Sequence, residues 1–166
     1  MTGRPGPVIH ATKLPSRMPP ERLHIRPGPD SVVATDPGHA GWRYLSFRAF
    51  SLGPGETVHL DRPEEEVALV TISGGGVELT VDGGRPISLP GRRSVFEGMP
   101  WSAYLPAGSA VAIVGQPLAG MRATVAVAQA PPTGRTGVST TPLVVAPGDV
   151  EIEIRGRGNA TRQVNN

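Results

Sequence analysis

The sequence predicts an all-β domain, folded as a sandwich or a barrel. About ten short runs rich in β-branched and aromatic residues follow Gly41 at intervals of roughly 8 to 12 residues, with Gly- and Pro-rich turns between them. No stretch has the apolar period of a helix longer than a turn or two. The length of 166 residues suits one domain with its own core plus a tail.

The amino-terminal residues predict an extended arm. Seven of the first thirty residues are proline, and proline excludes both regular helix and central strand. The same thirty residues hold five Lys or Arg and two acids, so this segment is basic. We therefore divide the chain into a Pro-rich basic arm at 1–37, a barrel at 38–155 and a connector at 156–166.

We expect the strands of the barrel where apolar and polar residues alternate between two turn sequences. In "GVELTVD", Val77, Leu79 and Val81 share one face, as a half-buried strand requires. The run "DVEIEIR" repeats the pattern and predicts that Ile152 and Ile154 point inward. In chain order, the expected strands are 42–50, 57–60, 67–73, 77–81, 85–89, 92–96, 102–105, 110–115, 122–130, 141–146 and 149–155.

Composition excludes several classes of function. The chain has no cysteine, which rules out disulfides and thiolate metal sites. It shows no apolar run of a signal peptide and none near the roughly 18 residues of a membrane span, so we expect a cytoplasmic protein without a membrane partner. After residue 30, eleven Arg balance twelve acids, and a nearly neutral barrel does not predict nucleic-acid binding.

The segment "GETVHLDRPEEEVALVTISG" at 55–74 resembles the first metal-binding motif of cupin barrels. A divalent metal needs about three fixed nitrogen or oxygen donors with open positions for substrate. The segment offers His59, has Asp61 in place of the second histidine, and offers Glu66. The segment "PAGSAV" at 106–111 resembles the second cupin motif, Pro-x-Gly-x-x-His, but Val111 stands in place of its histidine. We therefore expect a metal-free barrel, in which these four positions are degenerate and the catalytic residues are unknown.

Alternative interpretations of these residues stay open. His59, Asp61 and Glu66 could still bind an unconventional metal, but a lone histidine on a strand is more often a structural residue. Glu64 and Glu66 could share a face or belong to a solvated turn. Several arginines could clamp a carboxylate or phosphate, or form surface contacts: Arg92, Arg93, Arg155, Arg157 and Arg162.

Four stretches carry a resemblance to a family: "AGWRYLSFRAFSLGPGE", "EEEVALVTISGGGVELTVDGG", "GRRSVFEGMPWSAYLPAGS" and "APGDVEIEIRGRGNATRQVNN". From about residue 38 to 166 the chain is similar to the amino-terminal half of the 5-deoxy-glucuronate isomerases, which are related to 4-deoxy-L-threo-5-hexosulose-uronate ketol-isomerase. The resemblance implies a cupin double-stranded β-helix, or jelly roll, in a protein with two barrels. It also implies that the family's divalent metal belongs to a second barrel that this chain lacks.

The resemblance implies an aldose–ketose isomerisation in myo-inositol degradation, with a structural role for this half. Whether the chain is itself an enzyme is left open, since it lacks the metal-binding half. We expect no cofactor in this chain, a small acidic sugar at most as ligand, and contact with a second cupin domain or a second copy. The alternative is a stand-alone, metal-free cupin that binds a small acidic sugar or acts as an interaction module.

Overall fold

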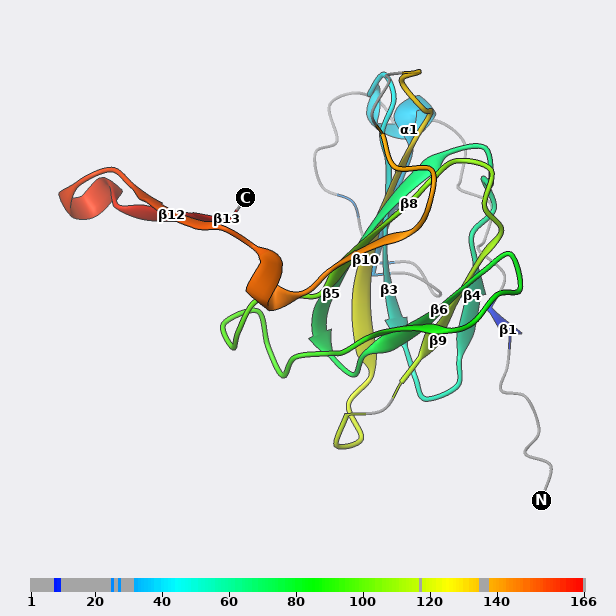
Figure 1. Ribbon diagram of the computed structural model, residues 1–166, viewed down its shortest axis with the longest axis horizontal. Helices are drawn as coiled ribbons and strands as arrows, with labels where there is room; N and C mark the ends of the chain where they lie inside the picture. The colour runs from blue at the N-terminus through cyan, green and yellow to red at the C-terminus, as the bar shows by residue number, and fades with distance from the viewer. Residues whose placement is uncertain are drawn as a thin grey trace.

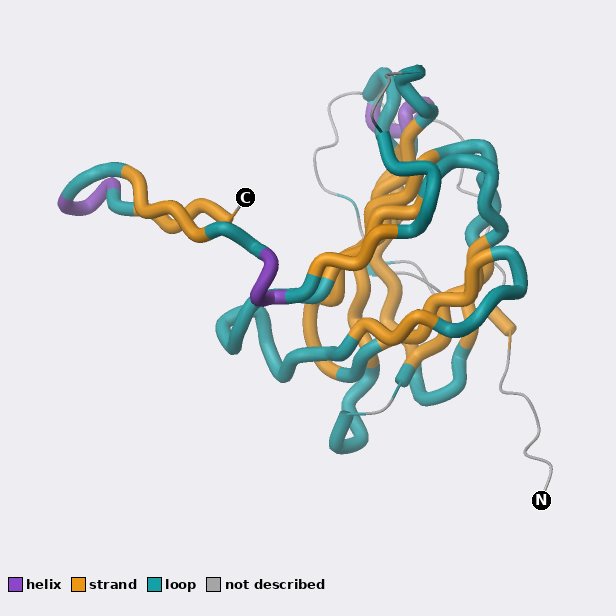
Figure 2. The backbone as a smooth tube through the Cα atoms, viewed as in Figure 1, coloured by secondary structure: helices purple, strands orange, loops and turns teal. Residues whose placement is uncertain are grey.

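Two β-sheets packed against each other form the barrel (Figures 1 and 2). The computed structural model describes residues 8–9, 25, 27, 32–116, 118–134 and 138–165. The first sheet has five strands in the order β1-β4-β9-β6-β7, and the second has six in the order β11-β8-β5-β10-β3-β2. Their bounds are β1 (Val8–Ile9), β2 (Val33–Thr35), β3 (Ser46–Leu52), β4 (Thr57–His59), β5 (Glu66–Gly74), β6 (Val77–Val81), β7 (Ile87–Leu89), β8 (Ser102–Leu105), β9 (Val111–Gly115), β10 (Ala123–Ala130) and β11 (Leu143–Val145).

Helical structure in the described residues is limited to single turns, as the sequence predicts. These are α1 (Pro37–Ala40), η1 (Pro147–Asp149) and η2 (Gly158–Ala160). Asp36 caps α1, because its Oδ1 accepts a hydrogen bond from the backbone N–H of His39 at 2.8 Å. No helix among the described residues is long and apolar enough to cross a membrane.

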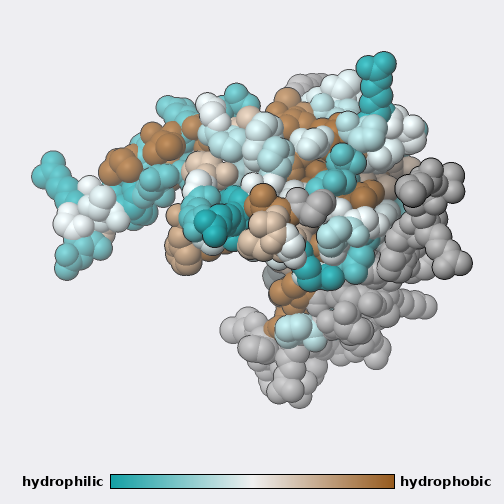
Figure 3. All heavy atoms as spheres, turned by 90° about the horizontal axis from the view of Figure 1, so that it is seen from below, coloured by the Kyte–Doolittle hydropathy of each residue, from teal (hydrophilic) through white to brown (hydrophobic). Residues whose placement is uncertain are grey.

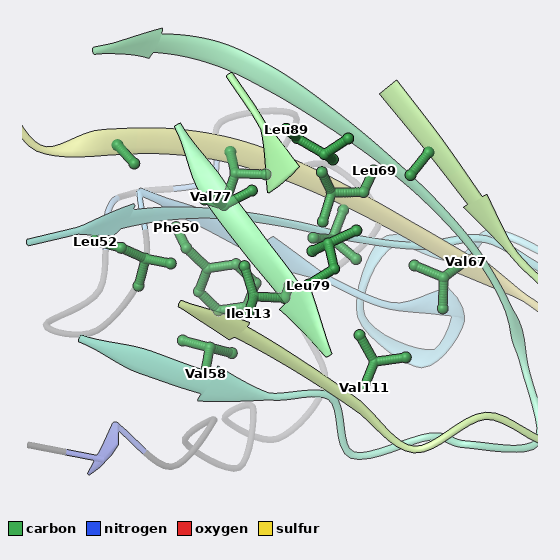
Figure 4. Packing of buried hydrophobic residues seen from close by; sticks show 14 of the residues in the cluster. Phe50, Leu52, Val58, Val67, Leu69, Val77, Leu79, Leu89, Val111 and Ile113 are labelled. Carbon is green, nitrogen blue, oxygen red and sulfur yellow. The ribbon is translucent and has the colours of Figure 1, made fainter. Parts of the chain in front are cut away.

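The core lies between the two sheets and is built by alternation along each strand (Figure 4). In β10 the side chains alternate without interruption between buried and half-buried, so one face of the strand lines the interior. The prediction for β6 is confirmed, since Val77 and Leu79 are fully buried and Val81 packs against the core. Leucine, isoleucine and valine therefore fill the barrel from both sheets.

One expected strand, at 92–96, is wrong. This segment is a loop, although its sequence "RRSVF" has strand-forming residues. Just before this loop, the backbone at Gly91 packs directly against the backbone of Gly74 and Gly75, so that a Cβ at Gly91 would overlap them. The Arg92 side chain donates hydrogen bonds to the carbonyl oxygens of Ile72 at 2.9 Å and Gly98 at 2.7 Å. These side-chain bonds stabilise the segment as a loop, in place of the backbone hydrogen bonds of a β-ladder. The strand predicted at 42–50 likewise begins only at residue 46.

The barrel differs from its expected boundaries at both ends. The sheet begins before residue 38, because β2 at 33–35 pairs with β3. The last barrel strand is β11, which ends at residue 145. Of the predicted N-terminal arm, most residues before 32 lie outside the described residues, although β1 pairs in parallel with β4.

The expectation that Ile152 and Ile154 point into the barrel is wrong. β12 (Ile152–Arg155) pairs only with β13 (Arg162–Asn165), and this C-terminal hairpin projects away from the barrel (Figure 1). Ile152 is 54% exposed and Ile154 is 63% exposed. The alternation is real, but no sheet of the described residues covers the apolar face. Figure 3 shows apolar surface along this projection.

Candidate functional site

The positions of the cupin motifs lie on different faces of the barrel. His59 ends β4 opposite Ala112 of β9, and it is exposed. Its neighbour Val58 is fully buried opposite Ile113. Because successive side chains of a strand point to opposite faces, His59 lies on the outer face of the five-stranded sheet.

Val111 lies on the inner face, at the start of β9. It is 3% exposed and belongs to the core cluster, where it lies with Val58 and Ile113 (Figure 4). Its carbonyl oxygen accepts a hydrogen bond from the backbone N–H of Leu60 at 3.0 Å. An apolar side chain at this position therefore continues the core.

Asp61 forms an ion pair with Arg48. Nη2 of Arg48 donates a hydrogen bond to Oδ2 of Asp61 at 3.0 Å, and Nη1 lies 3.0 Å from Oδ1 as an ion-pair contact. Arg48 is only 6% exposed and shares the inward face of β3 with Phe50 and Leu52. A buried guanidinium needs a counter-charge, and Asp61 supplies it.

A second cluster of polar contacts surrounds Arg62, next to Asp61 in sequence. Nη1 of Arg62 donates to Oγ of Ser46 at 2.7 Å and contacts Oε1 of Glu65 at 3.3 Å. Nη2 lies 3.6 Å from Oδ2 of Asp36, which caps α1. The carbonyl oxygen of Arg62 accepts a hydrogen bond from Nε2 of the buried Gln129 at 3.4 Å.

These contacts form a polar end of the barrel, on the side that carries α1 (Figure 1). We call it the polar end and define it by its residues: Asp36, Ser46, Arg48, Asp61, Arg62, Glu65 and Gln129. Its two arginines face three carboxylates. Oε2 of Glu65 is buried without a hydrogen-bond partner in the described structure.

Glu66 lies apart from this cluster, at the start of β5 on the outer face of the six-stranded sheet. Its neighbour there is Tyr104 of β8. Burial raises the pKa of Tyr104, and the charge of Glu66 and a hydrogen bond with it add to this effect.

The four motif positions do not fit a metal site. His59 faces outward, Val111 is part of the core, Asp61 is bound to Arg48, and Glu66 belongs to the outer face of the other sheet. Within the part of the chain that the structure describes, no group of three His, Cys, Asp or Glu side chains could hold a metal ion.

Two of the arginines considered as anion clamps, Arg92 and Arg155, make other contacts. Arg92 is bound to backbone carbonyl oxygens, and Arg155 pairs with Glu153 at 2.6 Å. Sequence analysis missed Arg48 as a residue of the polar end. A signal was present, because in "SFRAFSL" Arg48 has the same phase as Phe50 and Leu52, which predicts a charged side chain directed inward.

The fold and the substituted motif positions define a cupin-type barrel, a double-stranded β-helix, without the usual metal ligands. An IolB-like protein from Salmonella typhimurium LT2 has a similar structure, with a TM-score of 0.71 and 26% identity over 86% of this chain and 51% of that one. A putative glyoxylate-induced protein from Pseudomonas aeruginosa shares the fold at 15% identity and a TM-score of 0.52, over 75% of this chain and 43% of that one.

The chain belongs to the KduI/IolB family, whose model matches residues 20–166. It is 31% identical over 156 residues to a 5-deoxy-glucuronate isomerase of Geobacillus kaustophilus, covering 92% of this chain and 50% of the relative. It is also 31% identical over 139 residues to a 5-deoxy-glucuronate isomerase of Geobacillus thermodenitrificans, covering 82% of this chain and 47% of the relative. The chain thus spans about half the length of the curated relatives it matches.

Proposed function

We propose that this chain is the non-catalytic, amino-terminal barrel of a 5-deoxy-glucuronate isomerase acting in myo-inositol degradation. The observation that carries the proposal is the filled interior. Val111 lies in the core where the family motif would have a histidine. Asp61, at the position of a second histidine, forms an ion pair with Arg48. The two isomerases that resemble this chain are about twice as long, which leaves room in them for a second barrel.

The role proposed for this barrel is structural. An aldose–ketose isomerisation moves a proton between two carbons of an open-chain sugar, and it needs a base and a group that stabilises the enediolate. Inside the described barrel, each of the three carboxylates at the polar end forms an ion pair with Arg48 or Arg62. We propose that the divalent metal and the catalytic base belong to a second barrel.

The partners in this proposal are a second barrel of the family or a second copy of this chain. A small acidic sugar is at most a ligand of the assembled enzyme. The expectation that nucleic acid and membranes are not partners stays a prediction, as does the cytoplasmic location.

A chimera tests the proposal. In the Geobacillus kaustophilus relative, the matching segment is replaced by residues 38–166 of this chain, and conversion of 5-deoxy-glucuronate is followed by proton NMR. We expect the chimera to convert the substrate and this chain alone to be inactive with Zn²⁺ or Mn²⁺ added. The unmodified relative is the control.

Two results would contradict the proposal. One is turnover by the isolated chain at the rate of the relative, which would place catalysis in this barrel. The other is a chimera that folds and keeps the metal content of the relative but does not convert the substrate.

A further inference from the structure

The two faces of the C-terminal hairpin differ in charge. Directly paired residues of β12 and β13 share a face, so the register divides the hairpin into two sets of side chains. One set carries no charge and defines what we call the uncharged face: Ile152, Ile154, Gln163 and Asn165. The other set holds three charged side chains and a valine: Glu153, Arg155, Arg162 and Val164. Such a pair of faces is typical of strands that cover a core on one side and meet water on the other.

The isoleucines of the hairpin have the spacing of core residues but not their burial. In β6, Val77 and Leu79 stand two residues apart and are fully buried, because the six-stranded sheet covers them. Ile152 and Ile154 have the same spacing, yet they are 54% and 63% exposed. The hairpin forms a sheet of its own, and in the described structure no strand of the barrel pairs with it. The single turn η1 separates it from β11, the last strand of the barrel.

We propose that the hairpin is the first element of the family's second barrel, and that Ile152 and Ile154 belong to the core of that barrel. The inference rests on the proposed function, because it requires a second barrel after this one. In support, the family model matches the chain across the hairpin, up to residue 166. The two similar isomerases are about twice as long as their matched segments, so they contain enough chain for a further barrel.

The size of the uncharged face favours a covering segment of the same polypeptide over a second copy of the chain. At about 3.3 Å per residue and about 4.8 Å between strands, four residues on each of two strands span on the order of 130 Å². A stable interface between separate molecules buries about 800 Å² on each partner, which is several times more. A segment that continues from β13 is held near the face at an effective concentration on the order of millimolar, so a small contact area is sufficient.

Hydrogen exchange followed by mass spectrometry tests the proposal. In the 166-residue chain, we expect the amides of β12 and β13 to exchange as in a free hairpin. In the chimera described above, which joins residues 38–166 to the rest of the Geobacillus kaustophilus relative, we expect them to exchange at least about tenfold more slowly. The matching segment of the unmodified relative should be protected as well, and that measurement does not depend on the folding of the chimera.

Ile154→Ser and Val164→Ser form a matched pair of variants, because they remove β-branched side chains from opposite faces of the hairpin. In the chimera, Ile154→Ser is expected to restore fast exchange in the hairpin and to lower the midpoint of thermal unfolding, whereas Val164→Ser has a smaller effect. In the 166-residue chain, neither substitution should change that midpoint, since neither side chain belongs to the core of the first barrel.

Three results would overturn the proposal. The first is fast exchange of the matching segment in the unmodified relative, and the second is an equal effect of the two substitutions in the chimera. The third is a loss of stability caused by Ile154→Ser in the 166-residue chain. An active chimera whose hairpin exchanges rapidly contradicts only the assignment of the hairpin, whereas a chimera with a protected hairpin and no activity contradicts only the proposed function.

Discussion

Arg48 and Asp61 show how a single charged pair is held at the edge of an apolar interior. Arg48 is almost fully buried, whereas the Asp61 side chain is 46% exposed. Removing the carboxylate leaves the guanidinium without its counter-charge, but water can reach the gap. We therefore expect Asp61→Asn to lower the free energy of unfolding by about 1–2 kcal/mol, below the range for fully buried pairs.

Urea unfolding at pH 7 measures this effect. The control is Glu153→Gln, which breaks the exposed pair with Arg155 and is expected to cost less than Asp61→Asn, because water screens this pair. Equal losses in the two variants would show that the burial of Arg48 does not determine the contribution of Asp61.

The variant Val111→His tests whether restoring the motif histidine is enough to create a metal site. Val111→His places an imidazole in the core without a polar partner, and we expect a loss of about 1–3 kcal/mol in the free energy of unfolding. No stoichiometric metal should bind, because His59 lies on the outer face. Ala112→His is the control, since that residue faces outward and the change should have little effect on stability. Urea unfolding and metal analysis check the two expectations, and tight Zn²⁺ binding by Val111→His would contradict the expectation that no metal binds.

At the scale of the elements, the turn between β3 and β4 is closed by Glu56. Its Oε2 accepts hydrogen bonds from the backbone N–H of Gly53 at 2.8 Å and from Nη2 of Arg122 at 2.7 Å. The hydrogen bond from Gly53, followed by that from Arg122, lowers the pKa of Glu56 below its usual value of 4.5. A carboxyl group with a lowered pKa stabilises the fold above pH 4.5, and this contribution is lost as the pH falls through the folded pKa.

The comparison of wild type with Glu56→Gln measures this contribution. We expect wild type to be more stable than the variant at pH 7 and the difference to shrink as the pH falls below 4.5. Glu97→Gln, on an exposed loop outside this contact, is the control. A difference that is independent of pH would mean that the charge of Glu56 does not stabilise the turn.

The C-terminal hairpin is the element with the least support. A two-stranded hairpin alone in water is at best marginally stable, and Ile152 and Ile154 are exposed on one of its faces. We expect backbone amides of β12 and β13 to exchange with deuterium far faster than those of β5 and β10. Hydrogen exchange followed by mass spectrometry checks this, and slow exchange in the hairpin would show that another surface covers it.

At the scale of the whole molecule, the barrel has an apolar interior that is closed by polar contacts at the end carrying α1. The outer faces of its two sheets both mix apolar and polar side chains. They include Ala112 and Val114 on one sheet, and Ser51, Ser102 and Thr124 on the other.

The sequence by itself determined the all-β class, the positions of most strands and the loss of the metal motif at Val111. Alternation and turn residues are local properties, and they identify a strand and its apolar face without knowledge of its neighbours. They placed Val77 and Leu79 correctly for that reason.

Only the tertiary structure decided which part of the molecule packs against the apolar face of each strand. It showed that Ile152 and Ile154 lie outside the barrel, that 92–96 is a loop held by Arg92, and that His59 and Asp61 do not converge with Val111 and Glu66. The same pattern of alternation serves a strand in a barrel and a strand in a free hairpin, because the period of the side chains does not specify the partner strand. Pairing between strands far apart in sequence depends on the whole fold, and that pairing separated the four motif positions.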